Sequence, residues 1–295
     1  GRHAVVAFTD DWRADAGRRD FTINALYANP VSGEISDFFG GVADLAEGRV
    51  RFIGVALDRI AEDHLRILRF FRFHARFGAG APDAAGLAAC TARANDLMTL
   101  SRERVRDEML KLLVVADPVP TLATMLAAGI LAGVLPEIDA GRLPALGRLV
   151  AAEAALGRGP GAIRRLAAIL PVDAAVLDDI GRRLRLSNLE RRRLVLTARR
   201  TTGLAEAGYR DGIDSAVDRA LLADAPDIAA LAAFADGWRK PELPVSGRHL
   251  IGRGLAVGPG VSHALASFEA AWIAAGFPAD PATYEALVDA AIKDA

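Results

Sequence analysis

The chain has 295 residues, of which 52% are hydrophobic, and a formal net charge of −1. A chain of this length and apolar content can bury a substantial core, as one large domain or two to three small ones, which excludes a disordered polypeptide. The near-zero charge excludes a globally basic surface, so any contact with nucleic acid must come from local clusters of arginine.

One cysteine and five histidines limit the kinds of site that the chain can build. Cys90 alone excludes an internal disulfide and a cysteine metal site, and the histidines lack the spacing of a zinc site. No long uncharged apolar run appears, and the first four residues show no signal-peptide pattern. We therefore expect a cytoplasmic protein with no membrane partner and no structural metal, while the oligomeric state stays open.

The first 40 or so residues predict β structure. Strand-like segments run from Ala4 to Phe8, from Phe21 to Tyr27 and from Glu34 to Phe38, with turn residues at Asn29-Pro30 and Gly40-Gly41. Because the pattern begins abruptly inside a strand, we expect a further segment upstream of residue 1.

From about Asp58 onward the pattern is helical, because Ala, Leu and Arg dominate and β-branched alternation almost disappears. Ser101, followed by Glu103 and Arg104, predicts a helix start. Helix breaks are predicted at Gly78 to Pro82, Asp117-Pro118, Gly133 to Pro136, Gly157 to Gly161, Pro171, Gly203, Gly212 and Pro241 to Gly247. The sequence therefore predicts an α+β fold in which a small β region precedes a nearly all-α remainder.

The segment from Ile60 to Phe77 is the most informative part of the chain. Read as a single helix at about 100° per residue, it carries its charges on one half and Leu68, Phe71 and Ala75 on the other, core-facing half. Phe70 and Phe73 fall among the charges, where a solvated face rarely carries aromatic rings. The charged residues are Glu62, Asp63, Arg66, Arg69, Arg72 and Arg76.

Two interpretations of these charges stay open. One is a surface helix with an Asp63–Arg66 ion pair worth a few tenths of a kcal/mol, which leaves an excess of arginine. The other is base recognition, because a carboxylate can accept a hydrogen bond from an exocyclic amino group while a guanidinium donates to a ring nitrogen. Cytosine and adenine present an amino donor beside a ring acceptor, whereas uracil and guanine present a ring N–H, so Asp63 and Arg66 could accept C and A and reject U and G.

A second charged segment runs from Gly17 to Leu26. Arg18 and Arg19, followed by Asp20, could hold a phosphate and a sugar hydroxyl together. Clusters of this kind also protect strand edges, so the segment alone does not decide between binding and structure.

Taken in order, three motifs resemble those of the class II CCA-adding enzyme and bacterial poly(A) polymerase family. Two later stretches are similar to further segments of that family: Ser101 to Val105 with Glu108 and Lys111, and Pro244 to Ile251 with Gly258-Pro259-Gly260. The resemblance therefore spans essentially the whole chain. The three ordered motifs are Arg18 to Ala25, then Asp37 to Gly41 with Asp44-Leu45, then Glu62 to Arg66.

The resemblance implies three parts: a truncated nucleotidyltransferase-type head at 1–54, a helical neck with a nucleobase-selecting motif at 55–116, and a helical, tRNA-binding body and tail at 117–295. It implies an enzyme that joins CTP and then ATP to the tRNA 3′ end and releases pyrophosphate. A poly(A) polymerase, a CC- or A-adding specialist and a non-catalytic RNA-binding module stay open as alternatives.

The resemblance also implies roles for individual residues. Asp63 and Arg66 would select the base. Contacts with the phosphates or ribose of the nucleotide would come from Arg19, Arg69 and Arg72, with Arg18, Asp20 and Asn24 shaping the pocket. His64 departs from the proline or alanine of many relatives, at a position that does not read the base.

The start of the chain departs from the family pattern. In the family, a glycine-rich motif and two Mg²⁺-binding aspartates lie upstream of the segment that resembles Arg18 to Ala25, and nothing before Arg18 is similar to them. Asp10, Asp11 and Asp15 lack an Asp-x-Asp setting on a strand, so we interpret them as a solvated acidic turn. We therefore expect the metal ligands upstream of residue 1, no catalytic residue in this chain, and no transferase activity from the chain alone.

A third basic region lies on two consecutive predicted helices. Contact with tRNA phosphates is one interpretation, and a solvated amphipathic surface is the other. Arg199 and Arg200 follow the region. Its arginines are Arg182, Arg183, Arg185, Arg191, Arg192 and Arg193.

Overall fold

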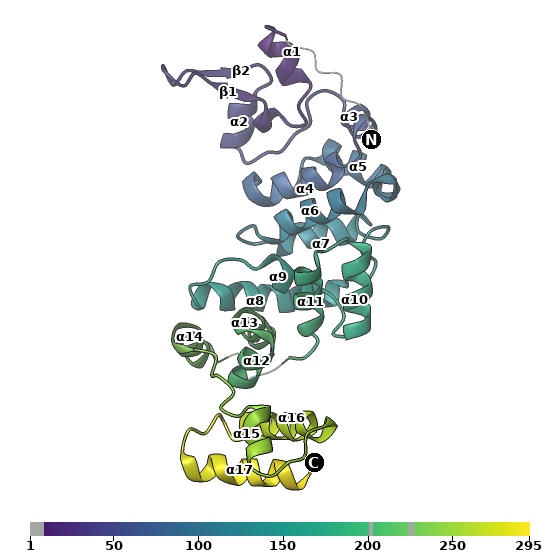
Figure 1. Cartoon of the computed structure of the whole chain (residues 1–295). Coiled ribbons are helices and arrows are strands. Elements are labelled where there is room, and N and C mark those ends of the chain that lie inside the picture. Colours follow the sequence, from purple (N-terminus) through teal and green to yellow (C-terminus); the bar gives the residue numbers. More distant parts are fainter. Residues whose placement is uncertain (1–8, 201–202, 224–226) are drawn as a thin grey trace. The chain divides into compact units, whose positions relative to one another are not determined.

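The computed structural model describes residues 9–200, 203–223 and 227–295, which form mainly helices joined by short loops (Figure 1). The chain divides into two compact units, Gly1–Ala198 and Arg199–Ala295. The described residues form mostly helices and one small sheet, which confirms the α+β prediction. None of the helices formed by the described residues is long and apolar enough to cross a membrane.

The sheet of the first unit is smaller than expected. β1 (Leu26–Ala28) pairs antiparallel with β2 (Ile35–Asp37). The predicted strand from Phe21 to Tyr27 is wrong over most of its length, because Thr22–Asn24 form a 3-10 turn. There the Thr22 hydroxyl bonds Asp44 at 2.6 Å, and side-chain bonds of this kind compete with a strand ladder. The predicted strand from Ala4 to Phe8 lies outside the described residues.

Two short helices flank this sheet. α1 (Trp12–Gly17) begins at Asp11, whose carboxylate accepts from the backbone N–H of Ala14 at 3.0 Å. α2 (Gly41–Ala46) follows Gly40, which has a φ of +79° that favours glycine. The Asp37 carboxylate accepts four backbone N–H groups at this turn, those of Phe39, Gly40, Gly41 and Val42.

Two helices replace the single helix expected from Ile60 to Phe77. α3 (Ala56–Glu62) ends at Asp63, whose extended backbone has a φ of −154°, and α4 (Arg66–Phe77) begins three residues later. Phe70 and Phe73 are buried because aromatic rings of the preceding segment pack on them: Phe52 lies 5.5 Å from Phe70, and Phe21 lies 5.0 Å from Phe73. Both halves of α4 are therefore packed, which explains the aromatic rings among its charges.

The rest of the first unit is helical. The predicted breaks fall between its helices, and Ser101 caps α6 as expected. α4 packs against α6, and α6 against α9 (Figure 1). The helices are α5 (Ala84–Ala92), α6 (Arg102–Leu113), α7 (Val119–Ala127), α8 (Leu143–Ala155), α9 (Ala162–Ile169), α10 (Ala174–Arg183) and α11 (Asn188–Leu196), with 3-10 turns at Ala94–Thr99 and Ala140–Arg142.

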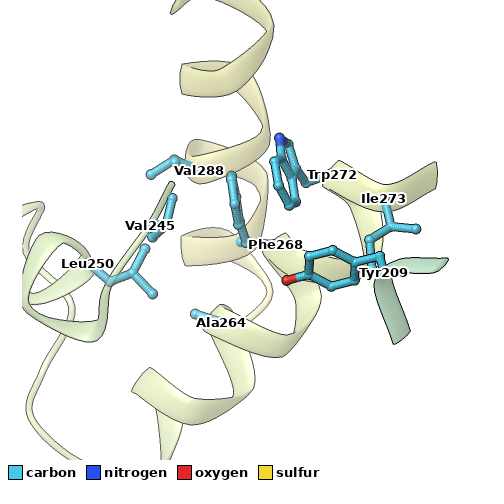
Figure 2. Close-up of a cluster of buried hydrophobic side chains, with 9 residues drawn as sticks. Tyr209, Val245, Leu250, Ala264, Phe268, Trp272, Ile273 and Val288 are labelled. Atoms are coloured by element: carbon cyan, nitrogen blue, oxygen red, sulfur yellow. The ribbon is translucent and has the colours of Figure 1, made fainter. Parts of the chain in front are cut away.

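The second unit has a separate apolar core. Phe268 and Trp272 from one helix meet Leu250, Val288 and Tyr209 from other helices (Figure 2). The helices of this unit are α12 (Leu204–Asp211), α13 (Ile213–Leu221), α14 (Ile228–Gly237), α15 (Gly247–Gly252), α16 (Pro259–Ala274) and α17 (Pro281–Lys293).

Candidate functional site

A cavity of about 330 Å³ lies in the first unit between the segment 18–24 and the start of α4. Five arginines and two aspartates line it, which leaves three positive charges in excess and favours an anionic ligand. We call it the arginine cavity. Its lining residues are Arg18, Arg19, Asp20, Asn24, Asp63, Leu65, Arg66, Arg69 and Arg104.

The arginine cavity brings together every residue expected to bind or support the nucleotide except Arg72. Two segments about forty positions apart in the sequence supply them. Arg72 instead donates from Nε to Glu108 of α6 at 2.6 Å and lines a different cavity.

Arg59 joins the two segments. From α3 its Nη2 donates to the carbonyl oxygens of Arg18 at 2.7 Å and Arg19 at 2.6 Å, while its Nη1 bonds Glu62 at 2.6 Å. Arg66 donates to the same Arg18 carbonyl at 3.2 Å. Arg59 was not among the expected site residues, because backbone carbonyls forty positions away leave no local signal in the sequence.

Asp63 is held in the cavity by Arg104. Its Oδ2 accepts from Arg104 Nη2 at 2.7 Å, and its Oδ1 accepts from the Leu65 N–H at 3.2 Å. Burial alone would raise the pKa of Asp63, but these two hydrogen bonds and the charges of Arg104 and Arg66 hold that pKa below its ordinary value. Asp63 is therefore a carboxylate at neutral pH and can only accept hydrogen bonds.

The Asp63–Arg66 ion pair of the surface-helix interpretation does not form. Arg66 pairs with Glu62 at 2.6 Å, whereas Asp63 pairs with Arg104. Arg104 was expected only at a helix start, and its place in the cavity depends on the packing of α4 against α6. It is the second site residue that sequence reasoning missed.

Asp20 is the most buried charge of the arginine cavity. It accepts from its neighbour Phe21 N–H at 3.1 Å, from Asn24 Nδ2 at 2.8 Å and from Arg69 Nε. Because Arg69 uses only Nε here, its two Nη groups have no hydrogen-bond partner among the described residues. The Asp20–Arg69 pair therefore fixes a guanidinium whose outer donors can meet a ligand.

Arg18 and Arg19 are exposed arginines that line the cavity. Arg18 pairs with Asp15, and Arg19 donates to the Asn24 carbonyl at 3.2 Å. The Arg19 guanidinium also lies over the Tyr27 ring, 5.1 Å from its centre. Both side chains are exposed to solvent and are therefore accessible to an anion.

The acidic residues near the start of the chain have structural contacts. Asp11 caps α1, and Asp15 accepts from the Tyr27 hydroxyl at 2.6 Å, so the interpretation of a merely solvated acidic turn is wrong for these two residues. Across the described residues, no group of three or more His, Cys, Asp or Glu could hold a metal. Asp20 and Asp63 are each paired with arginine, so the described residues do not fit a Mg²⁺ ion.

The basic region at 182–193 lies on α10 and α11, which pack against each other, and does not line the arginine cavity. Several of its arginines pair with acids: Arg182 with Asp179 at 3.5 Å, Arg183 with Glu137 at 2.7 Å and Arg191 with Asp178 at 3.7 Å. These pairs neutralise part of its charge. RNA contact by Arg182, Arg183, Arg185, Arg191, Arg192 and Arg193 stays a prediction.

Parts of this chain are similar to known proteins. Residues 1–51 match the Poly A polymerase head domain, and residues 83–141 match the family described as "Probable RNA and SrmB- binding site of polymerase A". CCA tRNA nucleotidyltransferase 1, mitochondrial, of Mus musculus is 47% identical over 115 residues, which are 38% of this chain and 26% of the relative. In these regions the chain is similar to members of the class II CCA-adding enzyme and poly(A) polymerase family.

Further CCA-adding proteins are similar to this chain in sequence or in fold. The Multifunctional CCA protein of Xanthomonas campestris pv. campestris (strain B100) is 42% identical over 130 residues, 43% of this chain and 31% of the relative. The Bacillus stearothermophilus CCA-adding enzyme in complex with CTP has a TM-score of 0.74 at 26% identity, covering 96% of this chain and 75% of that chain. The Thermotoga maritima CCA-adding enzyme complexed with tRNA_CCA has the same fold, with a TM-score of 0.65 at 21% identity and coverage of 96% and 74%.

The sequence matches extend over a limited part of the relatives. Residues of this chain align with 26% of the mouse protein and 31% of the Xanthomonas protein. The chain therefore spans less than a third of the length of these curated relatives in the aligned regions.

Proposed function

We propose that this chain is part of an enzyme that adds CCA to the 3′ end of tRNA from CTP and ATP, and that the arginine cavity binds the incoming nucleotide. The observation that carries the proposal is the assembly of Arg19, Asp20, Asp63, Arg66 and Arg69 around one cavity from two distant segments. The CCA-adding relatives and the CTP complex of the Bacillus enzyme support it.

Asp63 and Arg66 can read the edge of a base. Asp63 uses one acceptor site of each oxygen on Arg104 and Leu65, which leaves further acceptor capacity for the amino group of cytosine or adenine. Arg66 donates to protein oxygens through Nη1 and Nη2, and its Nε has no partner among the described residues. Uracil and guanine would place a ring N–H against a guanidinium donor, and this unmatched donor disfavours them.

The other arginines can bind the triphosphate. Arg69 is oriented by Asp20 with its Nη groups outward, and charge-assisted bonds from guanidinium to phosphate are among the stronger hydrogen bonds in proteins. The exposed Arg18 and Arg19 can add further bonds. In this arrangement the base and the phosphates contact different side chains. A substitution can therefore change the affinity for the triphosphate without changing which base is preferred.

In the intact enzyme we propose Mg²⁺ as the cofactor, in keeping with the family. The described residues of this chain do not fit the ion, so no step of nucleotidyl transfer is assigned to them. Their part in the reaction is to bind, orient and select the nucleotide.

We also propose three functional parts of the chain and a location for the protein. The head covers 1–54, the neck 55–116 and the tRNA-binding body and tail 117–295, and the protein acts in the cytoplasm. A poly(A) polymerase is the second candidate, because both matching family descriptions name polymerase A.

Incorporation of each labelled nucleoside triphosphate into a tRNA transcript lacking its CCA end tests the proposal. The assay compares this chain with the protein extended upstream in its native reading frame. Ordered addition of C, C and A by the extended protein supports CCA addition, whereas long A tails would identify a poly(A) polymerase. Binding of tRNA without incorporation by either protein would favour a non-catalytic RNA-binding module.

A further inference from the structure

A second cavity, of about 510 Å³, lies at the C-terminal ends of α4 and α6. Arg66 begins α4 and lines the arginine cavity, whereas Arg76 lies in its last turn and lines the second one. Ten helical residues rise roughly 15 Å, so the two cavities lie at opposite ends of the same helix. The second cavity is lined by Arg72, Ala75, Arg76, Lys111, Val114, Val115 and Ala116.

Positive charge exceeds negative charge in the second cavity. The buried Glu108 pairs with Arg72 Nε at 2.6 Å and with Lys111 Nζ at 3.3 Å. Arg76 lies over the Phe77 ring at 5.2 Å, and none of the carboxylates in the described part of the chain pairs with it. Three cations against one carboxylate leave two positive charges for a ligand.

The C-terminal end of α6 at this cavity repels an anion less than an uncapped helix end would. Unsatisfied carbonyls give a helix C-terminus a partial negative charge. At the end of α6, however, Arg165 Nη1 donates to the carbonyls of Leu113 at 2.8 Å and Val115 at 2.6 Å. Arg165 is itself buried and paired with Glu153 at 2.7 Å, so the guanidinium is fixed beneath this end of the helix.

We propose that Arg72, Arg76 and Lys111 bind backbone phosphates of the RNA whose 3′ end reaches the arginine cavity. The inference rests on the proposed function and adds a location for its RNA partner. The other lining residues, Ala75 and 114–116, carry apolar side chains and offer no set of groups that reads bases, so the contact is independent of RNA sequence. Residues 111–116 also fall within the segment 83–141, which matches a family described as a probable RNA-binding site.

The test measures binding of a tRNA transcript lacking its CCA end. Fluorescence polarisation gives the affinity at salt concentrations between about 50 and 200 mM. The variant is Arg76→Gln with Lys111→Gln. Arg72 is left intact because it makes the shorter ion pair with the buried Glu108, at 2.6 Å against 3.3 Å for Lys111. The slope of log affinity against log salt should fall by about 2, one for each lost phosphate contact, with equal weakening on RNAs of different sequence.

Two controls make the result specific. Arg93→Gln removes an exposed arginine that lines neither cavity, and it should change neither the affinity nor the slope. The Kd values for CTP and ATP should stay unchanged in the double variant, because neither residue lines the arginine cavity. If the double variant melts at a lower temperature than the unaltered chain, Arg76→Gln alone is used. The slope of log affinity against log salt should then fall by about 1.

Three outcomes would overturn the inference: a wild-type affinity and slope in the double variant, a change no larger than that of Arg93→Gln, or no binding of tRNA by the unaltered chain. A different result would show that the proposed function is wrong. In that case the unaltered chain would bind CTP, ATP, UTP and GTP alike, whatever the effect of Arg76 and Lys111 on RNA binding.

Discussion

At the scale of single residues, the pairing of Asp63 with Arg104 determines what the arginine cavity can recognise. Asp63→Ala removes the acceptor for the amino group of cytosine or adenine. We expect discrimination against UTP and GTP to fall by about 1–3 kcal/mol, which is roughly 5- to 150-fold. The measurement is the ratio of Kd values for CTP and UTP, and for ATP and GTP.

The matched control is Asp107→Ala. Asp107 is an exposed aspartate on α6 that pairs with its neighbour Arg106 and does not line the arginine cavity. The Asp107→Ala substitution should leave the CTP/UTP and ATP/GTP ratios of Kd values unchanged. Equal ratios in Asp63→Ala and the unaltered chain would show that Asp63 does not read the base.

The lowered pKa of Asp63 gives a prediction about pH. A carboxyl group whose pKa is depressed by folding contributes stability above its unfolded pKa of about 4, and that contribution is lost as pH falls through the folded pKa. Asp63 therefore keeps its charge throughout pH 5 to 8. The CTP/UTP ratio of Kd values should stay constant over this range, and a transition near pH 6 would assign base choice to another group.

Most residues that line the cavity could be predicted from the sequence, whereas Arg59 and Arg104 could not. Asp63, Arg66 and Arg69 were expected because they lie in short motifs. Arg59 and Arg104 act on partners about forty positions away, a distance in sequence that no local pattern records. Arg72 was expected beside Arg69, but the turn of α4 directs it to Glu108.

At the scale of elements, the break between α3 and α4 places Asp63 in the cavity. No glycine or proline marks this break in the sequence, so a continuous helix was the natural prediction. The extended backbone of Asp63 depends instead on tertiary contacts, among them its bond to Arg104. The breaks that were predicted each contain glycine or proline, whereas the break between α10 and α11 contains neither and was not predicted.

The buried network on α8 and α9 supports α6, which carries Arg104 and Lys111. Glu153 pairs with Arg164 at 2.6 Å and Arg165 at 2.7 Å, and all three side chains are almost fully buried. Glu153→Ala would leave two buried guanidinium groups without this partner, and we expect it to lower the free energy of unfolding by about 3–5 kcal/mol. Urea denaturation measures this loss.

Glu103→Ala is the control for Glu153→Ala. Glu103 is an exposed glutamate in the first turn of α6, and its loss should change the free energy of unfolding by no more than about 0.5 kcal/mol. Equal stability of the two variants would show that the buried network contributes little.

At the scale of the whole molecule, the two units have separate cores, so stability and nucleotide binding should be separable. Phe268 is fully buried in the second unit, and Phe268→Ala should cost that unit about 3–5 kcal/mol. Two of the three tryptophans, Trp238 and Trp272, lie there, so thermal unfolding followed by tryptophan fluorescence reports mainly on this unit. The affinity for CTP should not change, because the arginine cavity belongs to the first unit.

Val257→Ala provides the comparison for Phe268→Ala. Val257 is 83% exposed and its truncation should leave the thermal transition in place. A loss of CTP affinity in Phe268→Ala at a temperature where the first unit is folded would contradict the independence of the two units.

We propose that the arginine cavity selects nucleotides whose base carries an amino group beside a ring acceptor. Equilibrium titration of the unaltered chain with CTP, ATP, UTP and GTP tests it most directly, because binding alone is measured and no catalytic step is needed. We expect CTP and ATP to bind with similar affinity and UTP and GTP to bind more weakly. Equal binding of all four nucleotides, or preference for UTP or GTP, would contradict it.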